Sequence, residues 1–120
     1  MNSWLAVAAL NGAIAVAAGA FAVHGLRGEL TPDAMRIFDT AARYQMYHAL
    51  ALGLCALTLR ETTVRIPAWA FLAGIVLFCG SLYALALTGI KAFGYATPFG
   101  GVAFLTGWVA LAWAALRRQR

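Results

Sequence analysis

Charged residues are scarce in this chain of 120 residues, and this scarcity excludes most soluble folds. Only 11% of the residues are Asp, Glu, Lys or Arg, whereas a soluble domain usually contains about 25%. Hydrophobic residues make up 63%. Such a chain cannot cover a surface that faces water, so the medium around most of it is expected to be lipid. The length allows a single domain, over residues 1–120.

Cysteine and acidic residues are also few, and their placement removes several kinds of site. The two cysteines, Cys55 and Cys79, lie inside apolar runs without CxxC spacing, so we expect buried thiols rather than a disulfide. None of the four acidic residues falls inside an apolar run, where a hydrolase would need one to orient its base. The sequence therefore favours a protein that is not an enzyme, with an enzyme acting on lipid or quinone as a third alternative.

Basic residues outnumber acidic ones, and the net charge is +5 at pH 7. In a soluble protein, this excess would point to nucleic acid. Here the Lys and Arg residues lie between apolar runs and at the C-terminus, where they anchor helices and meet anionic lipid. Membrane lipid is therefore the expected partner, and nucleic acid is not.

Four apolar runs follow one another, and each is expected to form a helix that crosses the membrane. A helix of about 20 residues spans the ~30 Å hydrocarbon core. The first run is expected to be retained and not cleaved as a signal peptide, because residues 1–3 contain no Lys or Arg. Short loops at 60–65 and 88–97 make consecutive helices antiparallel neighbours. The sequence thus predicts an all-α, integral membrane four-helix antiparallel bundle, with helices at about residues 4–23, 34–59, 66–87 and 98–116.

The second helix is expected to begin at the membrane surface. Thr31, Pro32 and Asp33 supply an N-cap, a proline suited to the first helical position, and an acid in the first turn. Residues 34–43 carry apolar and charged side chains on different faces, which is typical of an amphipathic interfacial helix. The third helix is expected to begin at Ile66, with Pro67 in its first turn.

Four crossings place both termini on one side of the membrane, here named the terminal side; the opposite side is the loop side. Basic residues mark the side that stays in the cytoplasm. The terminal side carries the larger basic set, so cytoplasmic termini are predicted. This set is Arg60, Arg65, Arg117, Arg118 and Arg120. The loop-side set is Arg27, Arg36, Arg43 and Lys91.

Small residues recur at helical spacing in the first and fourth runs. Helices in lipid associate by close van der Waals contact and hydrogen bonds, and small side chains allow that contact. The glycines expected to pack helices are Gly12, Gly19, Gly100, Gly101 and Gly107. Two interpretations stay open: the small faces pack inside the bundle, or one of them meets another subunit.

Polar residues collect near the loop side, at the ends of the predicted helices. This polar set is His24, Arg43, Tyr44, Gln45, Tyr47, His48, Ser81, Tyr83 and Thr97. Polar side chains at membrane depth are costly unless paired, and they often mark function. The set is interpreted either as a hydrogen-bond cluster that locks the helix ends together or as a small binding site open to one face.

The two histidines raise the question of a metal. Imidazole and thioether groups suit Cu(I), so His24 and His48 could hold copper with Met35 or Met46. The chain has no HxxxH or HxxE pattern and no clustered carboxylates. No cofactor or metal is therefore predicted, and copper or zinc at the two histidines stays an alternative.

Four segments resemble the motifs of one known family. They are GAFAVHGL at 19–26, RYQMYHALAL at 43–52, FCGSLYALALTG at 78–89 and TPFGGVAFLTGW at 97–108. The family is domain of unknown function 423, small four-helix membrane proteins of bacteria with a mitochondrial relative called transmembrane protein 256. The resemblance covers nearly the whole chain and implies a multi-pass protein of the bacterial inner (plasma) membrane, without implying an activity. The family motifs carry over to His24, Gly25, Arg43, Tyr44, Gln45, His48, Gly80, Ser81, Tyr83, Thr97, Pro98, Gly100 and Gly101.

Two functions are expected from these features. The leading hypothesis is a non-enzymatic membrane protein that assembles with itself or serves as an accessory subunit of a larger complex. The alternative is a protein that binds or transports a small ligand, a lipid or a metal at the loop-side polar set.

Overall fold

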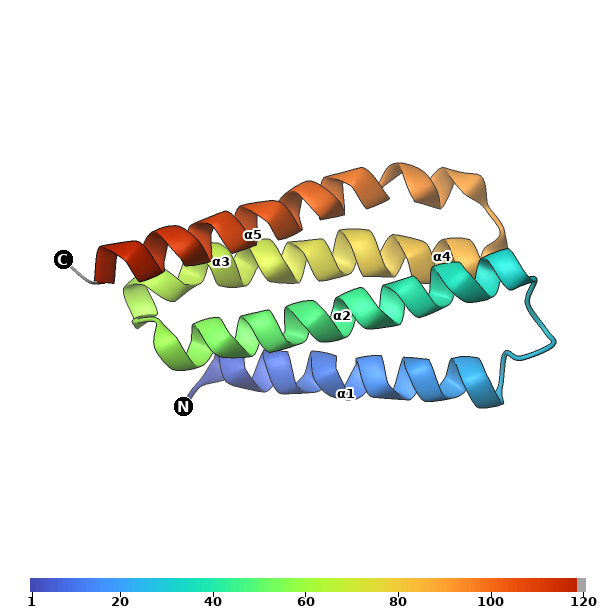
Figure 1. Ribbon diagram of the computed structural model, residues 1–120, viewed down its shortest axis with the longest axis horizontal. Helices are drawn as coiled ribbons and strands as arrows, with labels where there is room; N and C mark the ends of the chain where they lie inside the picture. Colours follow the sequence, from blue (N-terminus) through green and yellow to red (C-terminus); the bar gives the residue numbers. More distant parts are fainter. Residues whose placement is uncertain (119–120) are drawn as a thin grey trace.

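The computed structural model describes residues 1–118, and within that range the chain forms helices and short connections and no strand (Figure 1). The α-helices of this range are α1 (Ser3–His24), α2 (Pro32–Thr58), α3 (Glu61–Gly74), α4 (Gly80–Thr88) and α5 (Thr97–Arg118). A π-helical segment at Ile75–Cys79 joins α3 to α4, and a 3-10 helix at Lys91–Tyr95 precedes α5. The all-α prediction is therefore confirmed. Arg120, which the prediction counted on the terminal side, lies outside the described residues.

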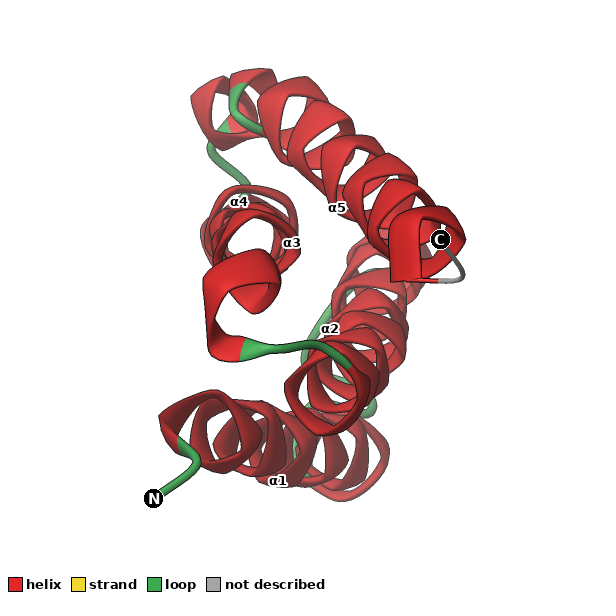
Figure 2. Ribbon diagram, turned by 90° about the vertical axis from the view of Figure 1, so that its left-hand side faces the viewer, coloured by secondary structure: helices red, strands yellow, loops and turns green. Residues whose placement is uncertain are grey.

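The long helices run alternately in opposite directions along a molecule of 53 × 27 × 19 Å (Figure 1). α1 leads away from the N-terminus, α2 returns, α3 and α4 lead out again as one rod, and α5 returns. The first and last described residues therefore lie at the same end of the molecule. Seen from that end, α2 and the α3–α4 rod lie between α1 and α5 (Figure 2).

Three helical stretches of residues 1–118 have the length and hydropathy expected of a membrane span. They are α1, the α3–α4 rod at Glu61–Thr88, and the stretch Lys91–Arg118. α2 does not meet the hydropathy expected of a span although it has 27 residues, because polar and charged side chains occupy much of its first half. The chain thus contains three apolar helical stretches of membrane-spanning length among the described residues. Hydropathy alone does not place α2 in the membrane.

The ends of α1, α2 and α5 lie within two residues of the predicted ends, and side-chain caps explain two of the starts. Asn2 accepts a hydrogen bond from the backbone N–H of Leu5 at 3.0 Å, where α1 begins. Thr31 accepts one from the N–H of Ala34 at 3.1 Å, next to Pro32 in the first position of α2. Such caps satisfy N–H groups that the helix itself leaves unpaired.

The predicted start of the third helix is wrong. α3 begins at Glu61, so residues 61–65 are helical and the connection after α2 is shorter than the predicted loop. Pro67 therefore lies inside the helix and not in its first turn. The acidic side chain of Glu61 favours a helix start at this point. An interior proline removes one N–H from the ladder, which helices packed in a membrane protein tolerate.

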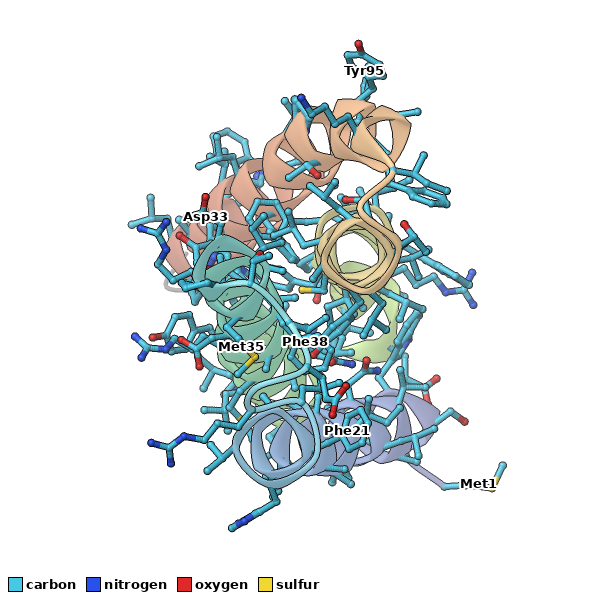
Figure 3. All side chains as sticks on the ribbon, turned by 90° about the vertical axis from the view of Figure 1, so that its right-hand side faces the viewer. Met1, Phe21, Asp33, Met35, Phe38 and Tyr95 are labelled. Carbon is cyan, nitrogen blue, oxygen red and sulfur yellow. The ribbon has the colours of Figure 1, made fainter. Side chains whose placement is uncertain are left out.

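The connection from α4 to α5 is more ordered than the predicted loop. Gly89 ends α4 with a φ of 71°, a left-handed conformation that glycine adopts without strain. The 3-10 helix Lys91–Tyr95 follows, and Tyr95 points away from the helices (Figure 3). The chain thus turns at the loop side through a short helical segment instead of an irregular loop.

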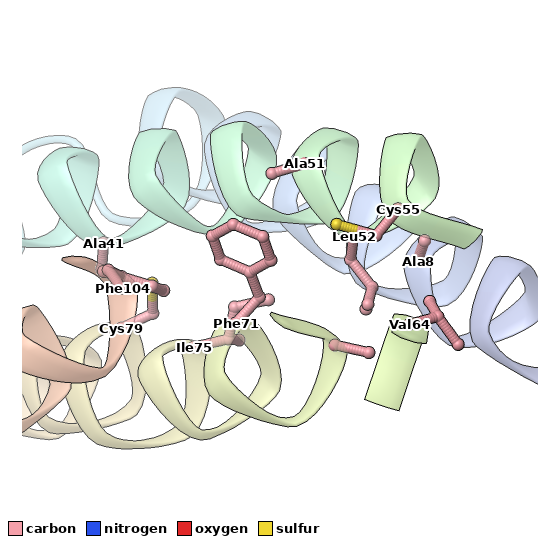
Figure 4. Close-up of a cluster of buried hydrophobic side chains, with 11 residues drawn as sticks. Ala8, Ala41, Ala51, Leu52, Cys55, Val64, Phe71, Ile75, Cys79 and Phe104 are labelled. Carbon is pink, nitrogen blue, oxygen red and sulfur yellow. The ribbon is translucent and has the colours of Figure 1, made fainter. Parts of the chain in front are cut away.

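The larger hydrophobic core lies along α2 and the α3–α4 rod, with contributions from α1 and α5 (Figure 4). Its largest fully buried side chains are Phe71 and Leu52. The fully buried Ala68 leaves room for a neighbouring helix. Cys55 and Cys79 are free thiols buried in the same core. They fill space between the helices and lie where a reagent in water does not reach them.

A smaller core lies at the loop side, under the beginning of α2. Phe38 packs with Leu26 and Ala86, and its ring meets that of Tyr83 edge-on with 4.9 Å between centroids. Met35 and Phe38 point toward α1, whereas Asp33 points outward (Figure 3). The first turns of α2 therefore bury an apolar side and expose a charged one.

Close helix contacts occur at two of the five glycines expected to pack. A Cβ on Gly107 would lie 2.7 Å from the ring of Phe71, and a Cβ on Gly100 would collide with the backbone of Phe78. No atom lies within 4 Å of the corresponding position at Gly12, Gly19 or Gly101. α5 therefore uses Gly100 and Gly107 against the α3–α4 rod, and the half-buried Gly12 and Gly19 of α1 have open space where a Cβ would lie.

Candidate functional site

A chain of buried and partly buried hydrogen bonds joins three helices near the middle of the molecule. The amide of Gln45 on α2 donates from Nε2 to Oδ1 of Asn11 on α1 at 3.1 Å. The hydroxyl of Tyr83 on α4 donates to Oε1 of Gln45 at 2.8 Å. Asn11 also donates to the carbonyl oxygen of Val7 at 2.9 Å. We name this set Asn11, Gln45 and Tyr83 the amide network.

The amide network lies deeper than the sequence predicted. Gln45 is the central residue of α2, which runs from Pro32 to Thr58, and it is only 4% exposed. Asn11, which is 8% exposed, was missing from the predicted polar set, although it is the one amide of the first apolar run. The prediction grouped polar residues by how near they lie to the loop side. The long side chain of Tyr83 instead reaches Gln45, which lies nearer the middle of the molecule.

A second polar contact joins α2 to α5 through His48. The indole N–H of Trp108 donates to Nε2 of His48 at 3.2 Å. Nδ1 of His48 lies 2.6 Å from the carbonyl oxygen of Tyr44. An indole nitrogen only donates and a carbonyl oxygen only accepts, so His48 is the neutral tautomer that carries its proton on Nδ1. We name Trp108, His48 and Tyr44 the histidine contact.

Aromatic rings enclose the histidine contact. The ring of Phe104 stacks on His48 with 3.5 Å between centroids and 9° between planes. The ring of Phe71 lies on another side, 5.8 Å away. His48 is 5% exposed, so both ring nitrogens and both ring faces are occupied by the protein itself. Trp108 was also missing from the predicted polar set; the signal for it was an indole N–H in the middle of an apolar run.

A third polar contact joins α4 to the beginning of α5. The hydroxyl groups of Ser81 and Thr97 lie 2.7 Å apart. The hydroxyl of Ser81 donates to the carbonyl oxygen of Phe78 at 3.0 Å. Because Ser81 has a single proton, Thr97 is the donor in the bond between the two hydroxyls.

The remaining members of the predicted polar set lie at the surface. His24 is exposed at the end of α1, and Tyr47 is exposed on α2 beside Tyr44. Nε of Arg43 lies 2.8 Å from a carboxylate oxygen of Asp39, and both side chains are exposed. Within residues 1–118, the structure thus divides the predicted polar set into three separate contacts and a group of surface residues.

The two histidines do not meet. His48 faces α5, and α1, which carries His24, lies on the far side of α2 (Figure 2). Nε2 of His48 accepts the indole N–H, so its lone pair is already used. In the part of the chain that the structure describes, no group of three or more His, Cys, Asp or Glu side chains could hold a metal ion. The predicted alternative of a shared metal therefore gains no support from this geometry.

A surface groove of about 660 Å³ lies between α2 and α5, beside the histidine contact. Tyr44, Tyr47 and His48 line one wall, and Phe104 and Trp108 line the other. Every buried side-chain nitrogen or oxygen of residues 1–118 has a hydrogen-bond partner. The groove therefore offers mainly aromatic and aliphatic surface, and the buried polar groups serve to join helices.

Proteins of several bacteria are similar to this chain over nearly their whole length. A UPF0382 membrane protein of Staphylococcus epidermidis is 43% identical over 119 residues, which cover 98% of each chain. The UPF0382 membrane protein YwdK of Bacillus subtilis is 39% identical over 121 residues, again 98% of each chain. A UPF0382 membrane protein of Haemophilus influenzae is 42% identical over 120 residues, which cover 98% of this chain and 97% of the relative.

No solved structure matches the chain. A family model described as "Protein of unknown function (DUF423)" matches residues 18–101. This stretch includes Gln45, His48, Ser81, Tyr83 and Thr97, but neither Asn11 nor Trp108. The resemblance found in the sequence motifs is therefore confirmed. This chain belongs to the DUF423 family of membrane proteins, whose function is unknown.

Proposed function

We propose that this protein is a non-enzymatic membrane subunit that crosses the bilayer four times and associates with a second copy of itself through α1. The observation that carries the proposal is the uncovered small-residue face of α1 at Gly12 and Gly19. Service as an accessory subunit, with another protein of a larger complex seated on the same face, is the related alternative.

α2 supplies the fourth crossing and closes the bundle in this proposal. It packs between α1 and the α3–α4 rod, and Ala41 and Leu52, three turns apart, are both fully buried. A helix that packs along its length against membrane-spanning apolar helices lies at the same depth in the membrane as they do. The polar side chains of Gln45 and His48 have partners inside the protein, so they do not carry the cost of unpaired polar groups in lipid.

The first turns of α2 form the interfacial lead-in of this arrangement. Asp33 pairs with Arg36, and Asp39 pairs with Arg43, and these side chains are exposed. Exposed charges belong at the level of the lipid headgroups and not in hydrocarbon. This stretch therefore marks the loop-side surface of the membrane.

A role without catalysis is supported by how the buried polar groups are used. Ser81, the only serine of the polar set, bonds to Thr97 and to a backbone carbonyl instead of a histidine. His48 is held as a neutral ring by a donor and an acceptor. These bonds fix helices to one another, which is what a stable subunit needs.

α1 carries two kinds of small residue, alanines that pack against the rest of the chain and glycines that do not, and this difference supports α1 as the contact helix. Ala8 and Ala15 are buried against the rest of the chain, whereas Gly12 and Gly19 beside them have open space in place of a neighbour. In lipid, helices join where small residues let backbones approach. Half-buried glycines with open space at the Cβ position fit a helix from outside the chain.

We also propose that the protein lies in the bacterial inner membrane with its termini in the cytoplasm. Counted in the sequence, the terminal-side set of Arg60, Arg65, Arg117, Arg118 and Arg120 has five members and the loop-side set has four. An excess of basic residues marks the cytoplasmic side. Fusion of a reporter that fluoresces only in the cytoplasm tests this orientation. A dark C-terminal fusion on a folded protein would reverse it.

Native mass spectrometry in mild detergent tests the proposed association. The unmodified protein is expected as a dimer or higher oligomer, and Gly12→Leu with Gly19→Leu is expected to shift it toward monomer. The matched control is Ala9→Leu with Ala20→Leu, two exposed positions on another face of α1, which should leave the assembly unchanged.

Three outcomes decide between the versions of the proposal. A monomer of the unmodified protein without any partner overturns it. A second protein that co-purifies and is lost with the glycine double variant favours the accessory subunit. Equal effects of the glycine and control variants would show that bulk on α1, and not this face, decides the assembly.

A second candidate is binding of a small ligand in the groove between α2 and α5. The observation that favours it is the aromatic lining that Tyr44, Tyr47 and Trp108 provide beside His48. Mass spectrometry of protein extracted without added lipid, together with analysis for copper and zinc, tests it. A bound molecule or metal that is lost in Tyr47→Ala would support this candidate, and protein free of both would reject it.

A further inference from the structure

A second groove, of about 930 Å³, lies between the start of α3 and the part of α5 that runs from Val102 to Arg118. Apolar side chains, among them Ile66, Val102 and Val109, form its walls. Its end at the terminal side is basic, because Arg60, Arg117 and Arg118 line it. We name it the arginine groove. It is separate from the histidine contact and from the α1 face.

Contacts within the protein hold two of the three guanidinium groups at the groove. Arg118 donates from Nη1 to the backbone carbonyl oxygen of Thr58 at the end of α2. Arg117 lies over the ring of Trp113, 4.9 Å from its centroid, as a cation–π pair. A guanidinium carries several N–H donors, so one such contact fixes its position without using all of them.

The groove changes from basic to apolar along the helix axis. Arg117 and Arg118 lie in the last turn of α5, and Val102 lies fifteen residues before Arg117. At ~1.5 Å per residue, this stretch covers roughly 22 Å, more than half of a ~30 Å hydrocarbon core. The side chains of Ile66, Leu105 and Val109 are largely exposed, so the apolar part opens to the surrounding lipid.

We propose that the arginine groove binds an anionic phospholipid, with its phosphate at the three arginines and an acyl chain along the apolar walls. Charge and apolar surface follow one another in the order in which a phospholipid presents its headgroup and its hydrocarbon. Arginine is suited to the phosphate because its planar fork of donors matches phosphate oxygens. This inference does not depend on self-association through α1.

The choice of a phospholipid over free phosphate or a peptide follows from the open apolar part. Free phosphate would use the arginines and leave the long apolar walls without a partner. A helix from another protein would need a continuous row of small residues for close contact, whereas in this groove Ala110 and Ala114 are accompanied by bulky aliphatic side chains such as Ile66. A flexible hydrocarbon chain fits an uneven surface of large aliphatic side chains.

The experiment compares two lipids of identical acyl chains by native mass spectrometry of the full chain. Phosphatidylglycerol is anionic, and phosphatidylcholine is zwitterionic. The expected result is retention of one phosphatidylglycerol, with about a tenfold or larger preference over phosphatidylcholine, because each basic residue near the membrane surface strengthens binding of anionic lipid. Arg60→Gln, Arg117→Gln and Arg118→Gln together should remove the preference.

Two further variants test whether retention of the lipid depends on the position of the charge and on the apolar walls. Arg27→Gln, Arg43→Gln and Lys91→Gln together remove equal charge from the loop side and should keep the preference. Ala110→Phe fills the apolar wall and should weaken retention while the arginines remain. Equal retention of the two lipids by the unmodified protein overturns the proposal, even if a variant fails to fold. Displacement of the lipid by inorganic phosphate alone, or no effect of Ala110→Phe, would assign the arginines to free phosphate.

Discussion

The indole N–H of Trp108 donates to Nε2 of His48 across 3.2 Å, and this bond assigns the proton of the ring to Nδ1. A tryptophan 60 positions away in the sequence thus determines which tautomer the buried His48 adopts. The contact is also a polar link between α2 and α5.

Replacing Trp108 with Phe should destabilise the protein. Nε2 of His48 would keep its buried position and lose its donor, which costs about 1–3 kcal/mol for an unsatisfied buried group. Thermal unfolding in detergent, followed by circular dichroism, measures the loss. Trp113→Phe is the matched control, because Trp113 contacts Arg117 through its ring face, which phenylalanine retains. Equal melting temperatures for the two variants would refute a structural role for the histidine contact.

The amide network should behave as one unit. Tyr83→Phe leaves Oε1 of Gln45 without its donor. Gln45→Leu leaves Oδ1 of Asn11 without its donor and the hydroxyl of Tyr83 without its acceptor. Each single change should therefore cost about 1–3 kcal/mol. The double variant should cost less than the sum, because the second change removes a group that has already lost its partner. A double-mutant cycle of unfolding free energies measures this coupling. Strict additivity would show that the three side chains do not act together.

Gly100 should tolerate a methyl group less well than Gly107. The Cβ of Gly100→Ala would collide with the backbone of Phe78, which cannot turn aside, whereas at Gly107 the obstacle is the ring of Phe71. We expect a loss of about 1–3 kcal/mol at Gly100 and a smaller loss at Gly107. Gly101→Ala has open space and serves as the control. Thermal stability in detergent ranks the three, and a reversed order would contradict the observed packing of α5.

Cysteine labelling should establish the depth of α2. In a background with Cys55→Ala and Cys79→Ala, a cysteine at position 36 should react with a membrane-impermeant maleimide, because Arg36 is exposed and charged. A cysteine in place of Leu50 should stay unlabelled in intact membranes, because that exposed side chain faces lipid if α2 is a span. Labelling of both positions at equal rates would remove α2 from the membrane.

The sequence was sufficient for the parts of the fold that hydropathy and capping control. Long apolar runs bounded by Thr31 or by arginines predicted the ends of three helices to within two residues. The start of α3 was missed because Pro67 was read as a first-turn residue, whereas the acid at Glu61 begins the helix. Local sequence carries both signals, and only the packed structure decides between them.

The candidate site was predicted less well, because its contacts depend on how helices rotate against one another. Gln45, His48, Ser81, Tyr83 and Thr97 do form buried polar contacts. Asn11 and Trp108, which complete two of those contacts, come from other helices, and no periodicity in the sequence pairs them with Gln45 or His48. Grouping by membrane side could therefore name polar residues and could not assign their partners.

The π-helical segment Ile75–Cys79 sets the register of the rod's outer half. The N–H of Gly80 reaches back to the carbonyl oxygen of Ile75, one residue farther than in an α-helix. This wide turn contains one residue more than an α-helical turn. The side chains of α3 and α4 therefore point in the same directions as in an uninterrupted α-helix that is one residue shorter. Removing Val76 should therefore leave Tyr83 aimed at Gln45 and preserve most of the melting temperature. Removing Leu50 from α2, which is α-helical throughout, should instead rotate the residues on either side of it by about 100° relative to one another and unfold the protein. The segment is the place where this membrane helix accepts a change of length.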